Sequence, residues 1–266
     1  MKPRTFVSLL SLVLLLPLNM KAELRTKAIE YKEGSTVLEG YLAYDSTAAG
    51  KHPGVLVVHQ WKGLGPNEKK RAEMLAQLGY VAFAVDIYGK GIRPSDQKSA
   101  GAEAGKYKSD RALLRKRVRA GLDELLKNEM VDTKRVAAIG YCFGGTTVIE
   151  LARSGADIAG VVSFHGALDS PTPADGKNIK CKVLALHGAD DPFVPVKDVA
   201  AFEDEMRSAN VDWQLVKYGG AVHGFTDWGA GTDNSKGMAY NERADKRSWE
   251  DMKQFFNELF GGTGRK

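Results

Sequence analysis

The chain has 266 residues, of which 43% are hydrophobic and 27% are charged, and its formal net charge is +5. This length supports one full hydrophobic core and is short for two independent enzyme domains. The composition is that of an ordinary globular protein. It excludes a small disulfide-rich scaffold, because Cys142 and Cys181 are the only cysteines.

The first 22 residues predict a secretory signal peptide. Lys2 and Arg4 give a positive start, the apolar run at 6–16 is too short to span a bilayer comfortably, and Ala22 is a small residue suited to cleavage. An uncleaved membrane anchor is the alternative. Cleavage would lower the net charge from +5 to +2, because the segment carries three basic residues and no acidic one. We therefore expect a secreted or periplasmic protein with a single domain over 23–266, free of the membrane once the leader is removed.

Short apolar runs alternate with amphipathic stretches along the rest of the chain. Alternating residues at 36–44 predict an antiparallel strand at a sheet edge. Continuous apolar runs predict buried strands at 54–59, 80–89, 135–140, 158–166, 181–188 and 212–220. Helical spacing predicts helices at 67–79, at 109–127, from about 144, and at 240–259. This alternation predicts an α/β fold, with a mostly parallel central sheet and helices on both faces.

The predicted helix at 109–127 carries a basic stripe. Arg111, Arg115 and Arg119 lie four residues apart on a face away from the apolar positions. A solvated surface stripe is the ordinary interpretation of such spacing. The alternative is a handle for an acidic substrate. No clustered basic face of the kind that binds nucleic acid is evident, so a nucleic-acid partner is not expected.

The sequence GYCFG, at 140–144, lies between a predicted strand and a predicted helix. Cys142 therefore occupies the centre of a G-x-S-x-G nucleophile elbow in place of serine. The tight turn needs glycine at both flanking positions, and it places the thiol at a helix N-terminus that favours a thiolate. The alternatives are a packing role and a disulfide. Cys181 lies in a predicted buried strand, so we expect it to be structural and unpaired.

Candidate partners for Cys142 follow two later strands. Asp190 and Asp191 come directly after the run at 181–188, and His223 lies in a glycine-rich loop after the run at 212–220. The order nucleophile, acid, histidine is that of α/β-hydrolases. The histidine would take the thiol proton, and a carboxylate would orient the histidine. One of the two aspartates is expected to serve the turn instead.

Further residues complete the predicted site. We expect the backbone N–H groups of Trp61 and Phe143 to hold an oxyanion. Gln60, Tyr88 and Phe225 are candidate substrate-binding residues. Three other histidines also follow predicted strands and are expected to make local structural hydrogen bonds, namely His59, His165 and His187. No metal site is predicted, because no recognised spacing of metal ligands occurs.

Five segments together resemble the dienelactone hydrolases, or carboxymethylenebutenolidases: VVHQWKGL, AVDIYGKG, GYCFGG, HGADDPFVP and YGGAVHGF. The resemblance extends from about Arg25 to Phe260. It implies an α/β-hydrolase fold, a Cys-Asp-His triad, and hydrolysis of an ester or lactone through a thioester. It also selects Asp191, because the family's acid is followed by two residues and then Val-Pro. Family members carry a glutamate where Gln60 stands, so we expect His223 to activate the thiol here.

The sequence therefore predicts a hydrolase that acts on small-molecule esters or lactones, needs no cofactor, and is favoured to be a monomer. The alternative is a non-catalytic α/β-hydrolase scaffold that serves as a binding module. The two differ in the expected chemistry of Cys142, which only the first requires to be a reactive thiol.

Overall fold

The computed structural model describes residues 23–261, so the predicted signal peptide lies outside the described residues. In chain order the strands are β1 (Leu24–Glu33), β2 (Thr36–Asp45), β3 (His52–Val58), β4 (Val81–Val85), β5 (Val131–Tyr141), β6 (Gly160–Phe164), β7 (Lys182–Gly188) and β8 (Trp213–Tyr218). The α-helices are α1 (Pro66–Gln77), α2 (Gln97–Ser109), α3 (Arg111–Leu126), α4 (Phe143–Arg153), α5 (Val196–Ser208) and α6 (Glu242–Phe260). Within 23–261, no helix is both long enough and apolar enough to cross a membrane.

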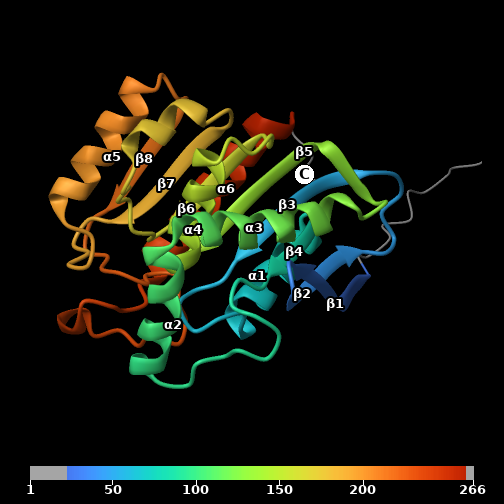
Figure 1. The fold of residues 1–266 in the computed structure, drawn as a ribbon, viewed down its shortest axis with the longest axis horizontal. Coiled ribbons are helices and arrows are strands. Elements are labelled where there is room, and N and C mark those ends of the chain that lie inside the picture. Colours follow the sequence, from blue (N-terminus) through green and yellow to red (C-terminus); the bar gives the residue numbers. More distant parts are fainter. Residues whose placement is uncertain (1–22, 262–266) are drawn as a thin grey trace, which may run out of the picture.

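All eight strands form one sheet, in the order β1-β2-β4-β3-β5-β6-β7-β8 (Figure 1). Six neighbouring strands, β4, β3, β5, β6, β7 and β8, are parallel to one another. The strands β1 and β2 form a hairpin that pairs antiparallel with β4 at one edge of the sheet. This confirms the predicted α/β fold. The stretch at 36–44 is antiparallel as expected, but it is not the edge strand. The edge is β1, which the sequence did not reveal because its side chains are mostly polar and only one of them is buried.

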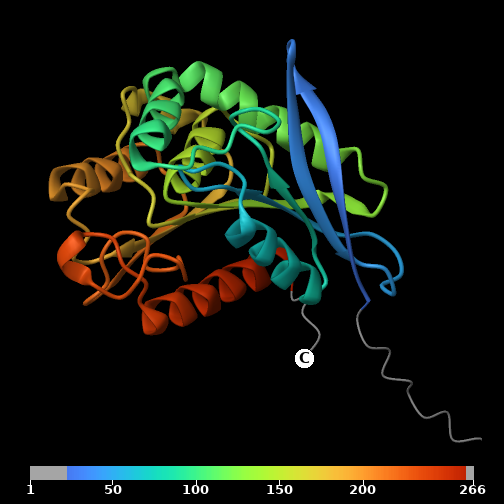
Figure 2. The same cartoon turned by 90° about the horizontal axis from the view of Figure 1, so that it is seen from below.

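Helices cover both faces of the sheet (Figure 2). Each face has its own apolar core. On one face α1 and α6 pack against the sheet through residues such as Leu75 and Phe256. On the other face α3, α4 and α5 contribute residues such as Leu122, Ile149 and Phe202. Strands buried on both faces are continuously apolar, which is why the runs in the sequence show no alternation.

A network of buried charges fixes the C-terminal end of α4, the helix that follows Cys142. The Arg153 side chain is fully buried and pairs with Glu150 at 2.8 Å and with Glu205 of α5 at 2.6 Å. Arg115 of α3 binds the same Glu150 at 2.8 Å. Because burying these charges is tolerable only while they are paired, the network ties three helices to one another.

The basic stripe of α3 is thus paired with acids. Arg111 pairs with Asp169 at 2.7 Å, and Arg119 pairs with Asp123 at 2.8 Å. No arginine of the stripe lines the cavity described below. The structure therefore supports the interpretation of a surface stripe over a substrate handle.

We expect Arg153→Leu to lower the free energy of unfolding by about 3–5 kcal/mol, because it leaves buried carboxylates without their partner. Chemical denaturation measures this change. Arg119→Leu, which removes a pair that is about half exposed on the α3 surface, is the matched control and should cost at most about 1 kcal/mol. Equal and small losses for the two variants would show that the buried network does not hold α4 in place.

Candidate active site

Cys142 lies in the turn that joins β5 to α4, with φ 53° and ψ −113°. Such a conformation is strained for a residue with a side chain and costs on the order of 1–3 kcal/mol. The flanking glycines are sterically required. A Cβ on Gly140 would lie 2.0 Å from the Gly144 carbonyl oxygen, and one on Gly144 would lie 2.2 Å from the Val58 carbonyl oxygen. The glycine spacing in the sequence therefore reflects the close approach of β3, β5 and α4.

The main chain of Cys142 is held from the neighbouring strand. Its N–H donates both to the Phe164 carbonyl oxygen at 3.0 Å and to Nδ1 of His165 at 3.1 Å. Nδ1 must then lack a proton, so Nε2–H of His165 donates to Oγ1 of Thr226 at 2.8 Å. Burial and the positive charge of His223 hold the pKa of His165 well below its usual range. His165 is thus a neutral structural histidine, as the sequence predicted.

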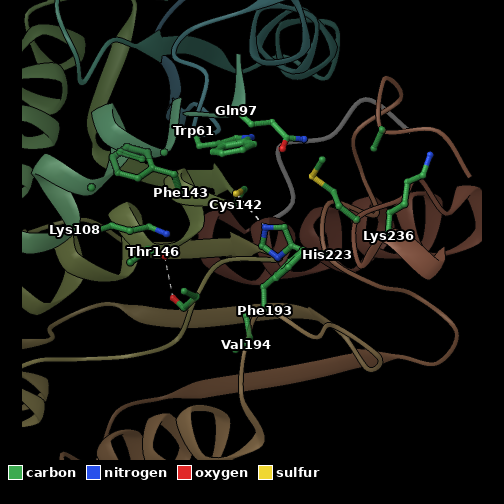
Figure 3. Close-up of a pocket in the computed structure, with 16 residues that line it drawn as sticks. Trp61, Gln97, Lys108, Cys142, Phe143, Thr146, Phe193, Val194, His223 and Lys236 are labelled. Atoms are coloured by element: carbon green, nitrogen blue, oxygen red, sulfur yellow. Dashed lines mark hydrogen bonds between the residues drawn. The ribbon is translucent and has the colours of Figure 1, made fainter. Parts of the chain in front are cut away.

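Cys142, His223 and Asp191 form one chain of hydrogen bonds, and Figure 3 shows the contact between Cys142 and His223. The Cys142 Sγ lies 3.0 Å from Nε2 of His223, and Nδ1 of His223 lies 2.8 Å from Oδ2 of Asp191. The other carboxylate oxygen of Asp191 accepts the Phe193 N–H at 2.8 Å. The structure therefore brings together the three residues that the sequence selected for the triad.

The loop that carries His223 is fixed from two sides. The His223 N–H donates to the Gly237 carbonyl at 3.2 Å, and its own carbonyl accepts the Ala239 N–H at 3.1 Å. Asp190 accepts the Gly220 N–H at 2.9 Å. Of the two adjacent aspartates, Asp190 thus stabilises the turn before the histidine, while the other carboxylate contacts the imidazole.

Electrostatics favour a charged pair at Cys142 and His223. Burial alone would raise the pKa of the thiol, but the positive charge and hydrogen bond of His223 outweigh it, with help from Lys108, and the pKa is lowered. Burial alone would lower the pKa of His223, yet the Cys142 thiolate and Asp191 raise it to about 10. Both shifts act in the same sense, towards a thiolate beside an imidazolium.

The thiol opens into a cavity of about 690 Å³. Most of its wall is apolar, and its lining residues are Trp61, Gln97, Gly101, Ala104, Gly105, Lys108, Cys142, Phe143, Thr146, Ala167, Phe193, Val194, His223, Ala230, Lys236 and Met238. A cavity of this size and character is typical of a site for a small organic molecule. Among the described residues, no group of three histidines, cysteines or carboxylates is arranged to hold a metal ion.

Both predicted oxyanion donors border this cavity. Phe143 is the first residue of α4, and its N–H lies beside the Cys142 sulfur, where it lowers the pKa of the thiol. The Trp61 N–H has no hydrogen-bond acceptor within residues 23–261. The Tyr88 hydroxyl fixes this part of the loop by donating to the Trp61 carbonyl oxygen at 2.9 Å.

The cavity wall does not include the three candidate substrate-binding residues, Gln60, Tyr88 and Phe225. All three are buried. The Tyr88 hydroxyl donates to the Trp61 carbonyl oxygen. The Phe225 ring packs against the His165 ring, with 5.1 Å between their centroids. The side chains of Tyr88 and Phe225 are thus engaged within the protein.

Two other histidines that follow strands differ from each other. Nδ1–H of His59 donates to the Gln60 carbonyl at 2.6 Å, and Nε2 accepts the Ile87 N–H at 3.2 Å, as expected for a structural histidine. Burial lowers the pKa of His59 to about 4. In contrast, Nδ1 of His187 is buried without a hydrogen-bond partner among the described residues, which the sequence did not predict.

The sequence missed one whole wall of the cavity. Five lining residues belong to α2, which is inserted between β4 and α3, and Phe193 follows the aspartate pair. The pattern of strand ends that points to Cys142 and His223 carries no information about a helix remote from a strand end. The alternation of small and polar residues in 97–109 was the available signal.

The chain is similar to known proteins over most of its length. A crystal structure described as a dienelactone hydrolase-like promiscuous phosphotriesterase from metagenomic libraries is 42% identical, with a TM-score of 0.86 over 90% of this chain and 99% of that one. Protein usf of Aquifex pyrophilus is 30% identical over 209 residues, 74% of this chain and 85% of that protein. A Synechocystis protein provisionally named carboxymethylenebutenolidase is 26% identical over 89% of this chain and 98% of its own length.

The sequence model of the dienelactone hydrolase family matches residues 38–260. This range begins within β2 and ends at the last residue of α6, so it includes the elbow, the aspartate pair and the histidine loop. Since the match extends over nearly the whole described fold, the chain belongs to the dienelactone hydrolase family and is a hydrolase of ester or lactone bonds.

Proposed function

We propose that the protein hydrolyses small esters or lactones with Cys142 as nucleophile, through a thioester intermediate. The observation that carries the proposal is the chain of short hydrogen bonds from Sγ through His223 to Asp191, at 3.0 Å and 2.8 Å. This chain supplies a nucleophile, a proton carrier and an orienting carboxylate, which is the arrangement that acyl transfer requires.

In the first half-reaction the Cys142 thiolate attacks the carbonyl carbon. The oxygen becomes negative and accepts hydrogen bonds from the N–H groups of Phe143 and Trp61. When the intermediate collapses, the C–O bond to the alcohol breaks and the alcohol takes the proton from Nε2 of His223. The acyl group is left on sulfur as a thioester. From a lactone, the alcohol stays attached to the acyl chain.

In the second half-reaction neutral His223 takes a proton from water, which attacks the thioester carbonyl. The C–S bond breaks, the carboxylic acid leaves, and the thiolate beside an imidazolium is restored. Asp191 holds the proton of His223 on Nδ1 throughout, so that Nε2 faces the sulfur. The low pKa of the Cys142 thiol, together with Lys108 in the cavity wall, accounts for activation without a glutamate at Gln60.

We also propose that the protein acts outside the cytoplasm. The support is the sequence of the first 22 residues, with its positive start, its apolar run at 6–16, and Ala22 before the proposed cut.

Cys142→Ala should lower kcat/KM for p-nitrophenyl acetate by at least about a thousandfold, because no other group replaces the nucleophile. The release of p-nitrophenolate measures this rate. Cys181→Ala is the matched control and should keep wild-type activity, since burial raises the pKa of the Cys181 thiol to about 12 and it lies outside the cavity. Full turnover by the Cys142 variant would refute the proposed nucleophile.

The pH dependence of Cys142 labelling by iodoacetamide should have a midpoint well below the ordinary thiol pKa of about 8.5. The midpoint is expected to be lower because His223 stabilises the Cys142 thiolate, so that the reactive form exists at lower pH. Asp191→Asn should move the midpoint up towards 8.5, whereas Asp190→Asn should leave it in place. A wild-type midpoint at the ordinary value would instead support a non-catalytic binding scaffold.

The full chain expressed in a Gram-negative host should be recovered from the periplasmic fraction with Glu23 at its N-terminus. N-terminal sequencing of the fractionated protein tests this. Leu14→Arg, which places a charge in the apolar run, should retain the uncleaved chain in the cytoplasm. A wild-type protein that keeps residues 1–22 in the cytoplasmic fraction would contradict the proposal.

A further inference from the structure

One wall of the cavity consists of a helix face almost without side chains. Gly101, Ala104 and Gly105 of α2 line the cavity, with Gln97 and Lys108 at the two ends of the same face. Their spacing of three and four residues places them on one side of the helix. Glycine is among the weakest helix formers, so two glycines in the interior of α2 oppose its formation.

Packing does not explain these two glycines. A Cβ on Gly101 or on Gly105 would meet no atom within 4 Å, and neither residue has a positive φ. Gly121 of α3 is the contrasting case, because a Cβ there would lie 2.6 Å from Cγ1 of Val85. The glycine of α3 is thus required by its neighbours, while those of α2 leave space in the cavity.

Apolar surface continues across the site from this helix. Phe193 lines the cavity, is 58% exposed, and directs its ring edge-to-face towards His223 at 5.6 Å between centroids. In Figure 3, Trp61 and Gln97 lie on one side of the Cys142–His223 pair, and Phe193 and Val194 lie on the other. An exposed aromatic ring beside a reactive pair is a surface that a bound apolar group would cover.

We propose that the α2 face and Phe193 receive a bulky apolar group of the substrate, an aryl or medium-chain alkyl group. The volume of about 690 Å³ falls in the range of sites for drug-sized molecules, whereas an acetyl group would leave most of it to water. Gly101 and Gly105 are then specificity-determining residues, since their missing side chains set the depth of the site. This inference rests on the proposed hydrolase function and names its substrate class.

The test compares kcat/KM along two arms. The acyl arm uses p-nitrophenyl acetate, butyrate and octanoate, and the alcohol arm uses phenyl acetate and 2-naphthyl acetate. We expect the wild-type enzyme to favour the larger member of at least one arm by about tenfold or more, the scale of effects that pocket fit produces. Gly105→Leu should lower that preference by about tenfold or more, because the new side chain occupies the space.

Ala102→Leu is the matched control, since it adds the same side chain to an exposed position of α2 outside the cavity, and it should leave the preference unchanged. Thermal unfolding should show both variants folded, because leucine is a better helix former than glycine and nearly as good a one as alanine. Gly105→Ala, a smaller change, should shift the preference in the same direction. A wild-type enzyme without preference in either arm, or equal losses on all esters in Gly105→Leu, would overturn the inference. Loss of p-nitrophenyl acetate turnover in Cys142→Ala would still support the proposed function.

Discussion

Cys142 holds a main-chain conformation that depends on three segments approaching one another without side chains between them. Gly144 packs on the carbonyl at the end of β3, and a Cβ on Gly145 would lie 2.8 Å from Cα of Gly166, just after β6. The N–H of Cys142 is bonded to the end of β6 as well. The strain of the turn is therefore supported by the sheet on both sides and by α4, all of whose residues are buried.

The charge distribution follows from this arrangement. The turn places a thiol at the start of α4, and a stable thiolate needs one nearby cation that can also carry a proton. His223 is that cation. His165 lies only 5.4 Å from the His223 ring between centroids, so a second positive charge there would oppose the first. The bond from the Cys142 N–H requires an unprotonated Nδ1 on His165, and burial keeps that ring neutral. The same contacts that fix Cys142 thus favour the charge on His223.

Strand ends were where sequence reasoning succeeded. In a parallel sheet, the residues that follow the strands gather at one edge, so Cys142 and His223 were expected at one edge, and the chain order and the glycine-rich loop distinguished His223 from the other histidines that follow strands. The pattern did not separate Asp190 from Asp191, because both follow the same strand, and the resemblance to the family selected the second. Asp190 accepts the N–H of Gly220, and Asp191 contacts the imidazole of His223. This difference depends on the direction of each side chain, which the order of residues does not determine.

The sequence is least informative where position along the chain does not decide packing. Gln60, Tyr88 and Phe225 follow strands in the sequence, as the triad residues do, but all three are buried and the cavity wall includes none of them. Similarly, β1 and α2 lack a strong apolar period. Both depend on tertiary contacts, so their own sequences gave little indication of them.

The glycines illustrate why such a site can be predicted only in part from its sequence. At 140 and 144 a side chain is impossible, because backbone atoms lie closer than any Cβ contact allows. At 101 and 105 a side chain would meet nothing, and its absence matters only to a molecule that occupies the cavity. The residue type is the same in both pairs, and three of the four glycines lie in helices, namely Gly101, Gly105 and Gly144. What distinguishes them is the surroundings, which are solid protein in the first case and open space beside a thiolate in the second. The first pair therefore fixes the position of the Cys142 thiol, and the second sets the space available beside it.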